Sequence, residues 1–557
     1  LRSMRRVLSV LGPVLWMVAL PMASKGAVER DPIPTPSAFF GVEVGEWHLR
    51  HDQLLAYYQA LAAASPRVRL QEYGRTYENR PLVVLAISSP ENLARFDGIE
   101  RQRRQWRAGD AAEGRPPLAV WLAYSVHGNE SSGANAGPVV AHQLAAGHDP
   151  EVLDWLEETV VFIDPCLNPD GLSRFAQWAN AFRGARLVGD ANHWEHVEGW
   201  PGGRGNHYWF DLNRDWLLLT HPESRGRVAW FQRWRPNVLA DFHEMGSDST
   251  YFFQPGAPIR QNPNTPARNL ELTRRIARFH ADVLDAAGRL YYTEERFDDF
   301  YYGKGSTYPD AQGSIGILFE QASSRGHLRE TQHGELSFPF TIQNQISTSF
   351  STLRAAHEMR DELLDYQRAF PKMALLEARE EPVAGYLVDL EDDPARARAF
   401  LDILARHEIE VVGLARDLVT DDGVFSAEGS VAVPMDQPQY RLARSLFERR
   451  KAFDDVTFYD VSTWNLAYSF GYRMGDLPRE ALVGSPVPWE PLPPLDDVET
   501  EPLLPKAYAY AIDWGRYSAP KTLAALLRAQ ARVYVATQPF AALTPRGVQE
   551  FDYGTLV

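Results

Sequence analysis

Apolar and polar positions alternate in blocks along residues 40–370 of this 557-residue chain. Short apolar runs predict buried strands, and longer stretches with apolar residues every three to four positions predict helices. Strands that alternate with helices predict an α/β fold, with a mixed, mostly parallel twisted sheet flanked by helices. The predicted strands are 68–73, 82–88, 118–124, 160–164, 238–242 and 315–319, and the predicted helices are 51–64, 136–146, 222–234, 265–287 and 340–369.

The alternation restarts after Pro371, which we expect to end the last of these helices. We therefore expect residues 30–370 to form one domain and residues 375–557 to form a second, smaller α/β domain. This second domain carries no motif to which a role can be assigned. The chain stops at Val557 soon after a strand-like region, which leaves the completeness of the domain open.

Polar residues follow the predicted strands of the first domain at the points where the strands end. They are His127, the Asn-Pro-Asp run 168–170, His243 and Glu320. Sites in open α/β sheets form at the carboxyl ends of strands, so these residues are the candidates for a site. His127 also stands three residues before Glu130, and an imidazole beside a carboxylate can supply two zinc ligands.

Spacing alone does not single out His127 and Glu130. Three other pairs have the same spacing, beginning at His148, His327 and His407, and none of them follows a buried strand. The position after a strand is therefore what favours the first pair.

Composition limits the chemistry further. Cys166 is the only cysteine, so an intrachain disulfide and a cysteine zinc cluster are both excluded, and a transition-metal site must use His and carboxylates. The formal net charge of −16 argues against a nucleic-acid partner, because such a protein needs a basic face for phosphates.

The first 26 residues have the pattern of a signal peptide. Met4-Arg5-Arg6 is basic, residues 7–20 are apolar, and small residues follow. We expect export to the periplasm or the medium; the alternative is an uncleaved anchor. No later stretch is long and apolar enough to cross a bilayer, so we expect no stable membrane insertion after cleavage.

Five motifs, in this order along the chain, resemble the zinc carboxypeptidase family, the metallopeptidases of the carboxypeptidase A and B type. They are HGNE (127–130), NPDG (168–171), DLNRD (211–215), DFHEMG (241–246) and GILFE (316–320). The resemblance covers about residues 40–350. It implies that His127, Glu130 and His243 bind Zn²⁺ with water in the fourth position, and that Glu320 is the general base. Zinc lowers the pKa of bound water from about 15.7 to about 7, and a carboxylate in reach takes the proton.

The resemblance also implies that Asn213 and Arg214 hold the terminal carboxylate of the substrate. A planar guanidinium suits this task because it donates two parallel hydrogen bonds. The family has an arginine that polarises the scissile carbonyl, for which Arg174 and Arg183 compete, and Arg183 is preferred.

A tyrosine of the family closes over the substrate; Tyr301, Tyr302 and Tyr308 compete for this role, and Tyr302 is preferred. The chain departs from the family pattern at Asn129 and in the long aromatic segment 174–209.

Together these features predict an exported zinc metallocarboxypeptidase that acts on the C-termini of peptides or proteins. One alternative is a zinc deacylase or amidase that acts on small or cell-wall-derived substrates. Another is a protein that keeps the fold and binds peptides or glycans without catalysis. The Asn213–Arg214 pair favours a substrate with a free carboxylate, and the complete set of ligands and base argues against a non-catalytic protein.

Overall fold

The computed structural model describes residues 33–109, 114–390, 393–453, 465–482, 489–492, 507–545 and 547–557. The predicted signal peptide lies outside these residues. Within them, no helix is both long enough and apolar enough to cross a membrane.

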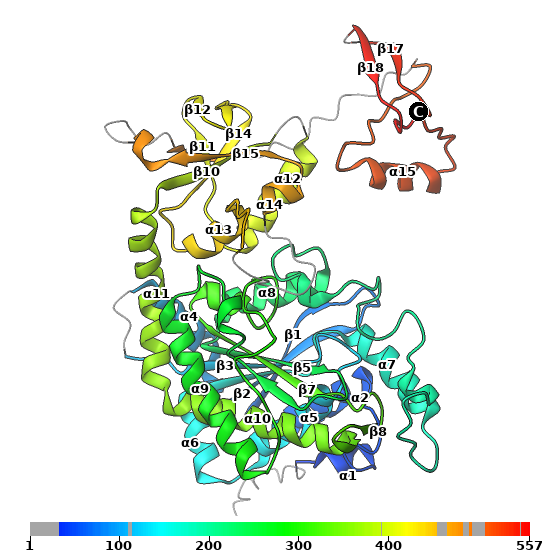
Figure 1. The fold of residues 1–557 in the computed structure, drawn as a ribbon, viewed down its shortest axis with the longest axis vertical. Helices are drawn as coiled ribbons and strands as arrows, with labels where there is room; N and C mark the ends of the chain where they lie inside the picture. The colour runs from blue at the N-terminus through cyan, green and yellow to red at the C-terminus, as the bar shows by residue number, and fades with distance from the viewer. Residues whose placement is uncertain are drawn as a thin grey trace, which may run out of the picture.

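A seven-stranded sheet forms the centre of the first part of the chain, with strand order β1-β2-β4-β3-β5-β7-β6 (Figure 1). The four inner strands β4, β3, β5 and β7 run parallel, and the outer strands β1, β2 and β6 are antiparallel to their neighbours. This is the predicted fold class. The strands are β1 (Val68–Arg75), β2 (Pro81–Ile87), β3 (Leu118–Tyr124), β4 (Thr159–Asp164), β5 (Val238–Met245), β6 (Tyr251–Phe253) and β7 (Ile315–Ala322).

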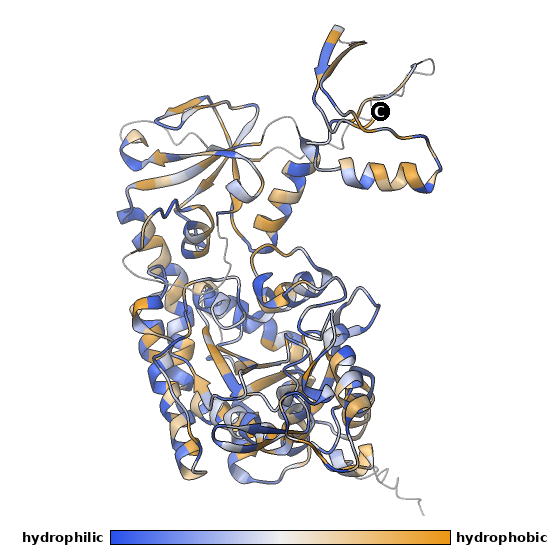
Figure 2. Ribbon diagram, turned by 45° about the vertical axis from the view of Figure 1, so that its right-hand side comes forward, coloured by the Kyte–Doolittle hydropathy of each residue, from blue (hydrophilic) through white to orange (hydrophobic). Residues whose placement is uncertain are grey.

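Helices cover both faces of this sheet. Side chains alternate between the two faces of a strand, so Val120 and Leu122 join one hydrophobic cluster and Ala119 and Trp121 join another. Because both faces are buried, the inner strands are mostly hydrophobic (Figure 2), and β3 is hydrophobic along its whole length. The helices of this part are α1 (Pro36–Phe40), α2 (His51–Ala64), α3 (Pro90–Ala94), α4 (Phe96–Ala108), α5 (Ser132–Ala146), α6 (Pro150–Glu158), α7 (Pro169–Phe182), α8 (Pro222–Trp234), α9 (Ala267–Ala286), α10 (Phe338–Glu358) and α11 (Arg360–Glu380).

The prediction of one helix over 340–369, ended by Pro371, is wrong. The helix breaks at Met359, and α11 continues through Pro371 to Glu380. A proline inside a helix removes one N–H and crowds the preceding turn. Buried residues of α11 on both sides of Pro371, such as Leu364 and Ala374, belong to the hydrophobic clusters of the core, and their packing outweighs this cost.

A second sheet of five strands follows α11, with order β15-β10-β14-β11-β16. All its neighbouring strands pair antiparallel. The hydrophobic cluster on the Trp121 face of the first sheet continues into this unit through Phe400 and Phe447. The elements of this second unit are β10 (Val383–Asp389), α12 (Pro394–Arg406), β11 (Val412–Leu414), β14 (Ser430–Pro434), α13 (Tyr440–Phe447), α14 (Leu466–Ser469), β15 (Arg473–Pro478) and β16 (Trp489–Glu490).

Three two-stranded pairs and one more helix complete the described elements. They are β8 (Leu328–Thr331) with β9 (Gly334–Ser337), β12 (Leu418–Thr420) with β13 (Gly423–Phe425), β17 (Phe540–Thr544) with β18 (Gly547–Phe551), and α15 (Ala519–Arg528).

Candidate active site

The loop after β3 holds His127 and Glu130 in a tight turn. The Glu130 N–H donates to the carbonyl oxygen of His127 at 3.1 Å. The Ser125 hydroxyl donates to the carbonyl oxygen of Glu130 at 2.8 Å. Both ends of the turn are therefore fixed, and the His127 and Glu130 side chains emerge together from the carboxyl end of a fully buried strand.

Gly128 is required in this turn by a close approach of two backbones. A Cβ atom at Gly128 would lie 2.1 Å from the carbonyl carbon of Gly171, at the start of α7. Asn168 caps that helix, because its Oδ1 accepts from the Gly171 N–H at 3.0 Å. Its Nδ2 donates to the carbonyl oxygen of Arg204 at 3.0 Å. The HGNE and NPDG motifs thus pack on each other, and the second motif also holds the loop that carries Arg204.

His243 and Glu320 come from neighbouring parallel strands. They are direct partners in the register of β5 and β7. Parallel strands bring their carboxyl ends to the same edge of a sheet, so these residues lie beside the loop that follows β3.

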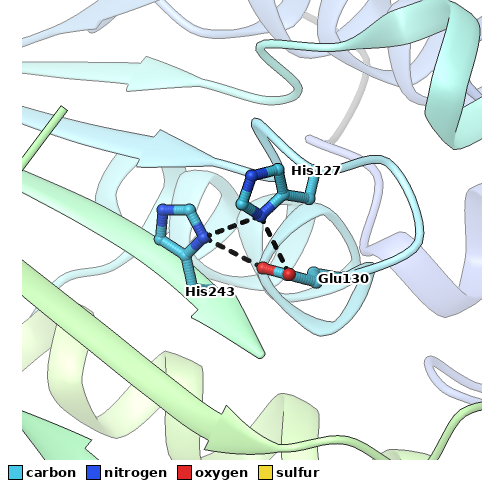
Figure 3. Close-up of side chains that lie close together, drawn as sticks. All are labelled: His127, Glu130 and His243. Carbon is cyan, nitrogen blue, oxygen red and sulfur yellow. Dashed lines mark hydrogen bonds and ion pairs between the residues drawn. The ribbon is translucent and has the colours of Figure 1, made fainter. Parts of the chain in front are cut away.

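Three side chains converge at this edge (Figure 3). Nδ1 of His127 lies 2.9 Å from Oε1 of Glu130, and Nδ1 of His243 lies 2.9 Å from Oε2 of Glu130. The two Nδ1 atoms are 3.2 Å apart. Ligand atoms about 2.0–2.1 Å from a tetrahedral zinc ion are themselves separated by about 3.3 Å, so this donor set has the spacing that one zinc ion needs.

The other nitrogen of each imidazole faces a carboxylate. His127 Nε2 lies 2.9 Å from Asp211 Oδ1, and His243 Nε2 lies 2.9 Å from Asp241 Oδ2. A carboxylate that accepts a hydrogen bond from the Nε2–H fixes the tautomer in which the lone pair of Nδ1 is directed at the metal position. Burial by itself lowers the pKa of both rings, but Glu130 and the facing carboxylates together outweigh burial and raise the pKa of each imidazole above its ordinary value.

A cavity of about 210 Å³ opens over the cluster. Glu320 lines it, and burial raises the pKa of this carboxyl to about 7, a shift that Glu130 also favours and that His243 opposes. Arg204 lies on the wall, with its guanidinium donating to Glu130 at 3.2 Å and to Asp211 at 2.9 Å. Further along the wall, Lys304 forms a buried ion pair of 2.7 Å with Asp298. The lining residues are His127, Glu130, Arg204, Asn213, Arg214, His243, Glu244, Met245, Phe297, Asp298, Lys304, Ser306, Leu318 and Glu320.

Residues 54–323 match the sequence model of the family described as zinc carboxypeptidase. The part of the chain that matches this family holds all three of the converging side chains. Carboxypeptidase D of Rattus norvegicus is 30% identical over 215 residues, which are 35% of this chain and 14% of the relative. Carboxypeptidase 2 of Trichophyton rubrum is 28% identical over 127 residues, 23% of this chain and 18% of the relative. The chain therefore spans less than a fifth of the length of these curated relatives.

The solved structures that resemble the chain include a metallo-carboxypeptidase from Burkholderia cenocepacia, with 15% identity and a TM-score of 0.41. The similarity covers 56% of this chain and 70% of that structure.

Zinc fits the three side chains of this zinc carboxypeptidase domain. Members of the family bind Zn²⁺, and His127, Glu130 and His243 offer two imidazole nitrogens and one carboxylate to a single point. This composition leaves one position open, as catalytic zinc sites do.

The structure places the predicted substrate clamp, Asn213 and Arg214, on the wall of the cavity. The Asn213 side chain is buried, and its Oδ1 accepts from the Gly305 N–H at 2.8 Å. Its Nδ2 faces Asp241 Oδ2 at 3.4 Å and His243 Nε2 at 3.1 Å. Asn213 is thus fixed beside a metal ligand, and Arg214 follows it with a guanidinium that donates to the Asn213 carbonyl oxygen.

Arg183 and Tyr302 are not among the residues that line the cavity in the described part of the chain. Arg183 is the C-terminal cap of α7, and its guanidinium lies 4.5 Å from the ring centroid of Trp47. Tyr302 is buried in the core, where its hydroxyl lies 2.6 Å from that of Thr265. The structure therefore does not bring these two residues to the candidate metal ligands, whereas Arg204 and Arg214 both line the cavity.

Sequence reasoning missed three residues of the site: Arg204, Asp211 and Asp241. Asp241 stands two positions before His243, and residues two apart on a strand share a face, so this spacing was a usable signal. Asp211 is two positions before Asn213 in the DLNRD motif, but it contacts His127 through a loop whose path the sequence does not specify.

Proposed function

We propose that this chain hydrolyses the C-terminal peptide bond of peptides, with Glu320 as the general base. The observation that carries the proposal is the presence of Glu320 in the same cavity as the three-residue ligand set. The relatives' own activity does not by itself carry over to this chain, because the chain matches only a small part of their length.

The residues divide the work as follows. His127, Glu130 and His243 would hold zinc, which when bound acidifies water and polarises a carbonyl group. The Glu320 carboxylate takes a proton from the attacking water and passes it to the departing amine. Burial of Glu320 favours the transfer of the proton to the departing amine. A carboxyl group with a pKa of about 7 both accepts and donates protons near neutral pH.

The cations of the cavity suit an anionic substrate. Arg204, Arg214 and Lys304 line it, and Arg204 lies against the ligand Glu130. We propose that Arg204 stabilises the negative charge that develops on the scissile carbonyl oxygen, because its guanidinium donates to the candidate metal ligand Glu130. We propose that Arg214 binds the free terminal carboxylate, since a guanidinium can pair with both carboxylate oxygens.

The test compares peptides that differ only at the C-terminus. The zinc-loaded enzyme is incubated with a peptide that ends in a free carboxylate and with the same peptide as its amide, with and without a chelator. We expect release of the terminal residue from the free acid only, and loss of this activity with the chelator. Equal cleavage of the amide would contradict the proposal and favour an amidase.

We also propose that the protein is exported. This rests on the basic start, the apolar run and the small residues within positions 4–26. Expression of the full chain followed by N-terminal sequencing of the mature protein tests it; a mature protein that still begins at Met4 in the cytoplasm would contradict it.

A further inference from the structure

A pair of exposed tryptophans stands on the loop that supplies Arg204 and Asp211 to the site. The side chains of Trp200 and Trp209 are 80% and 57% exposed. Their ring centroids are 4.6 Å apart. Tyr208 and Phe210 beside them are also more than half exposed. Clusters of exposed large apolar side chains are uncommon on soluble domains and mark interaction surfaces.

The loop holds this pair in a fixed place. Asn206 is fully buried, and its Oδ1 accepts from the backbone N–H groups of Tyr208 and Phe210. The Arg174 guanidinium donates to the carbonyl oxygens of Gly205 and Asn206 from behind, each at 2.8–2.9 Å. The tryptophans are therefore presented by an ordered turn.

Trp209 adopts φ = +66°, a left-handed conformation that is unfavourable for a bulky residue. Such strain persists only where the surrounding contacts impose it, and it is concentrated at functional positions. In this conformation the ring of Trp209 lies against that of Trp200.

Three side-chain contacts connect the same loop to the turn of residues 127–130, called here the metal-binding turn. Arg204 donates to Glu130, His127 contacts Asp211, and the Asn129 amide donates to Glu198 at 2.9 Å. Asn129 is the position at which the chain departs from the family pattern.

The backbone of Trp209 packs against Gly205, because a Cβ atom at Gly205 would lie 2.6 Å from the carbonyl carbon of Trp209. Gly205 directly follows Arg204, which lines the cavity, so the tryptophan pair lies beside this wall.

The cavity itself is too small for a whole peptide. Its volume of about 210 Å³ is below the range of about 300–1,000 Å³ that encloses a drug-sized ligand. A carboxypeptidase substrate ends one residue after the scissile bond, so the part that protrudes from the cavity is the upstream chain. An extended chain advances about 3.3 Å per residue, so the third residue before the bond lies about 10 Å from it, outside so small a cavity.

We propose that Trp200 and Trp209 form a subsite for apolar or aromatic side chains of the substrate, about three residues upstream of the scissile bond. This inference rests on the proposed function. The expected preferred substrates are peptides of four residues or more with an apolar upstream segment, rather than dipeptides. Stacking on the pair stabilises the bound peptide and lowers KM, while the groups that carry out the chemistry are unchanged.

The experiment uses three N-acetylated substrates with the same two C-terminal residues: a dipeptide, a tetrapeptide with Phe-Leu upstream and a tetrapeptide with Gly-Gly upstream. We expect the zinc-loaded wild type to show a KM about tenfold lower for the Phe-Leu peptide than for the Gly-Gly peptide, at similar kcat. In Trp200→Ala the ratio of the two KM values (Gly-Gly over Phe-Leu) should fall to about one, and kcat/KM for the dipeptide should stay at the wild-type value. Trp200→Phe should retain most of the KM ratio. Trp514→Ala, which removes an exposed tryptophan of the C-terminal segment, is the matched control and should change neither value.

If the two longer peptides had equal KM values in the wild type while the dipeptide was still cleaved, the proposed subsite would be contradicted and the proposed function would not. A ratio that survives in both Trp200→Ala and Trp209→Ala would also overturn the subsite. Binding of the enzyme to phospholipid vesicles that Trp200→Ala abolishes, with no change in the peptide ratio, would assign the pair to a membrane surface instead. Failure to cleave any of the three substrates would contradict the proposed function itself, and the subsite with it.

Discussion

His243 and Glu320 are direct partners across the parallel strands β5 and β7, at the edge of the sheet where the loop after β3 brings His127 and Glu130. One strand supplies a candidate metal ligand and its neighbour supplies the candidate base. Their relative position is fixed by the hydrogen-bonded ladder of the sheet, which is more rigid than a loop.

Replacement of Glu320 by Gln should remove the base and keep the metal. We expect kcat to fall by about 10²- to 10⁴-fold, the usual contribution of a general acid–base group. Bound zinc should be unchanged, because Glu320 is not one of the three ligands. Activity and metal content of the purified variant check this, with Glu335→Gln on the exposed strand β9 as control. A variant that lost its zinc would show that Glu320 had been given the wrong role.

The rate should depend on pH through the same carboxyl group. Glu320 must be ionised to accept a proton, and burial raises its pKa from 4.5 to about 7. Activity therefore falls as the pH decreases through the pKa, and bound zinc moves the midpoint downward because its charge favours the carboxylate. We expect the acid limb of a kcat/KM profile to have its midpoint between 4.5 and about 7. A flat profile across this range would contradict the assignment.

Asp241→Asn should weaken zinc binding without removing a ligand. Asp241 Oδ2 faces Nε2 of His243, and a carboxylate there fixes the tautomer and increases the basicity of the ring. Loss of such a partner costs about 10- to 100-fold in metal affinity. Competition with a chromophoric chelator measures the change, and Asp248→Asn on the loop after β5 is the control. Equal zinc affinity in both variants would show that Asp241 does not support the ligand.

Gly128→Ala should destabilise the fold. The new Cβ would lie 2.1 Å from backbone atoms of Gly171 and Leu172, which cannot turn away as a side chain can. Overpacking typically costs about 1–3 kcal/mol, and this contact involves two backbones, so we expect the upper end or more. Urea unfolding of the metal-free protein measures it. Gly246→Ala, which meets nothing within 4 Å, should be close to neutral.

Stability should also depend on pH through Asp164. This buried carboxyl accepts from the Tyr73 hydroxyl at 2.6 Å, and burial raises its pKa from 3.8 to about 7. The folded state therefore keeps a proton that the unfolded state releases above pH 3.8. The contribution of Asp164 is fully present below pH 3.8 and decreases as the pH rises to about 7, by at most about 1.4 kcal/mol per unit. In Asp164→Asn this dependence should be absent, so the change in Tm between pH 5 and pH 8 should be smaller than in the wild type. An unchanged difference would exclude Asp164 as its source.

The sequence by itself determined the class of the first sheet and indicated three of the polar side chains that meet at its edge. Buried strands are continuous apolar runs, and polar residues directly after such runs must lie at the strand ends; this pattern selected His127, His243 and Glu320. Local periodicity carries this information because each strand is a short, contiguous segment.

Only the tertiary structure decided which other side chains reach the ligands. Arg204 rather than Arg183 enters the cavity, because the loop from 198 to 211 folds back onto the metal-binding turn through contacts with Asn129 and Asn168. Tyr302 packs into the core with Thr265, although its position before β7 resembles that of a tyrosine that closes over substrate. The path of a long loop is set by contacts between residues far apart in the chain, and the period of hydrophobic residues holds no information about such contacts.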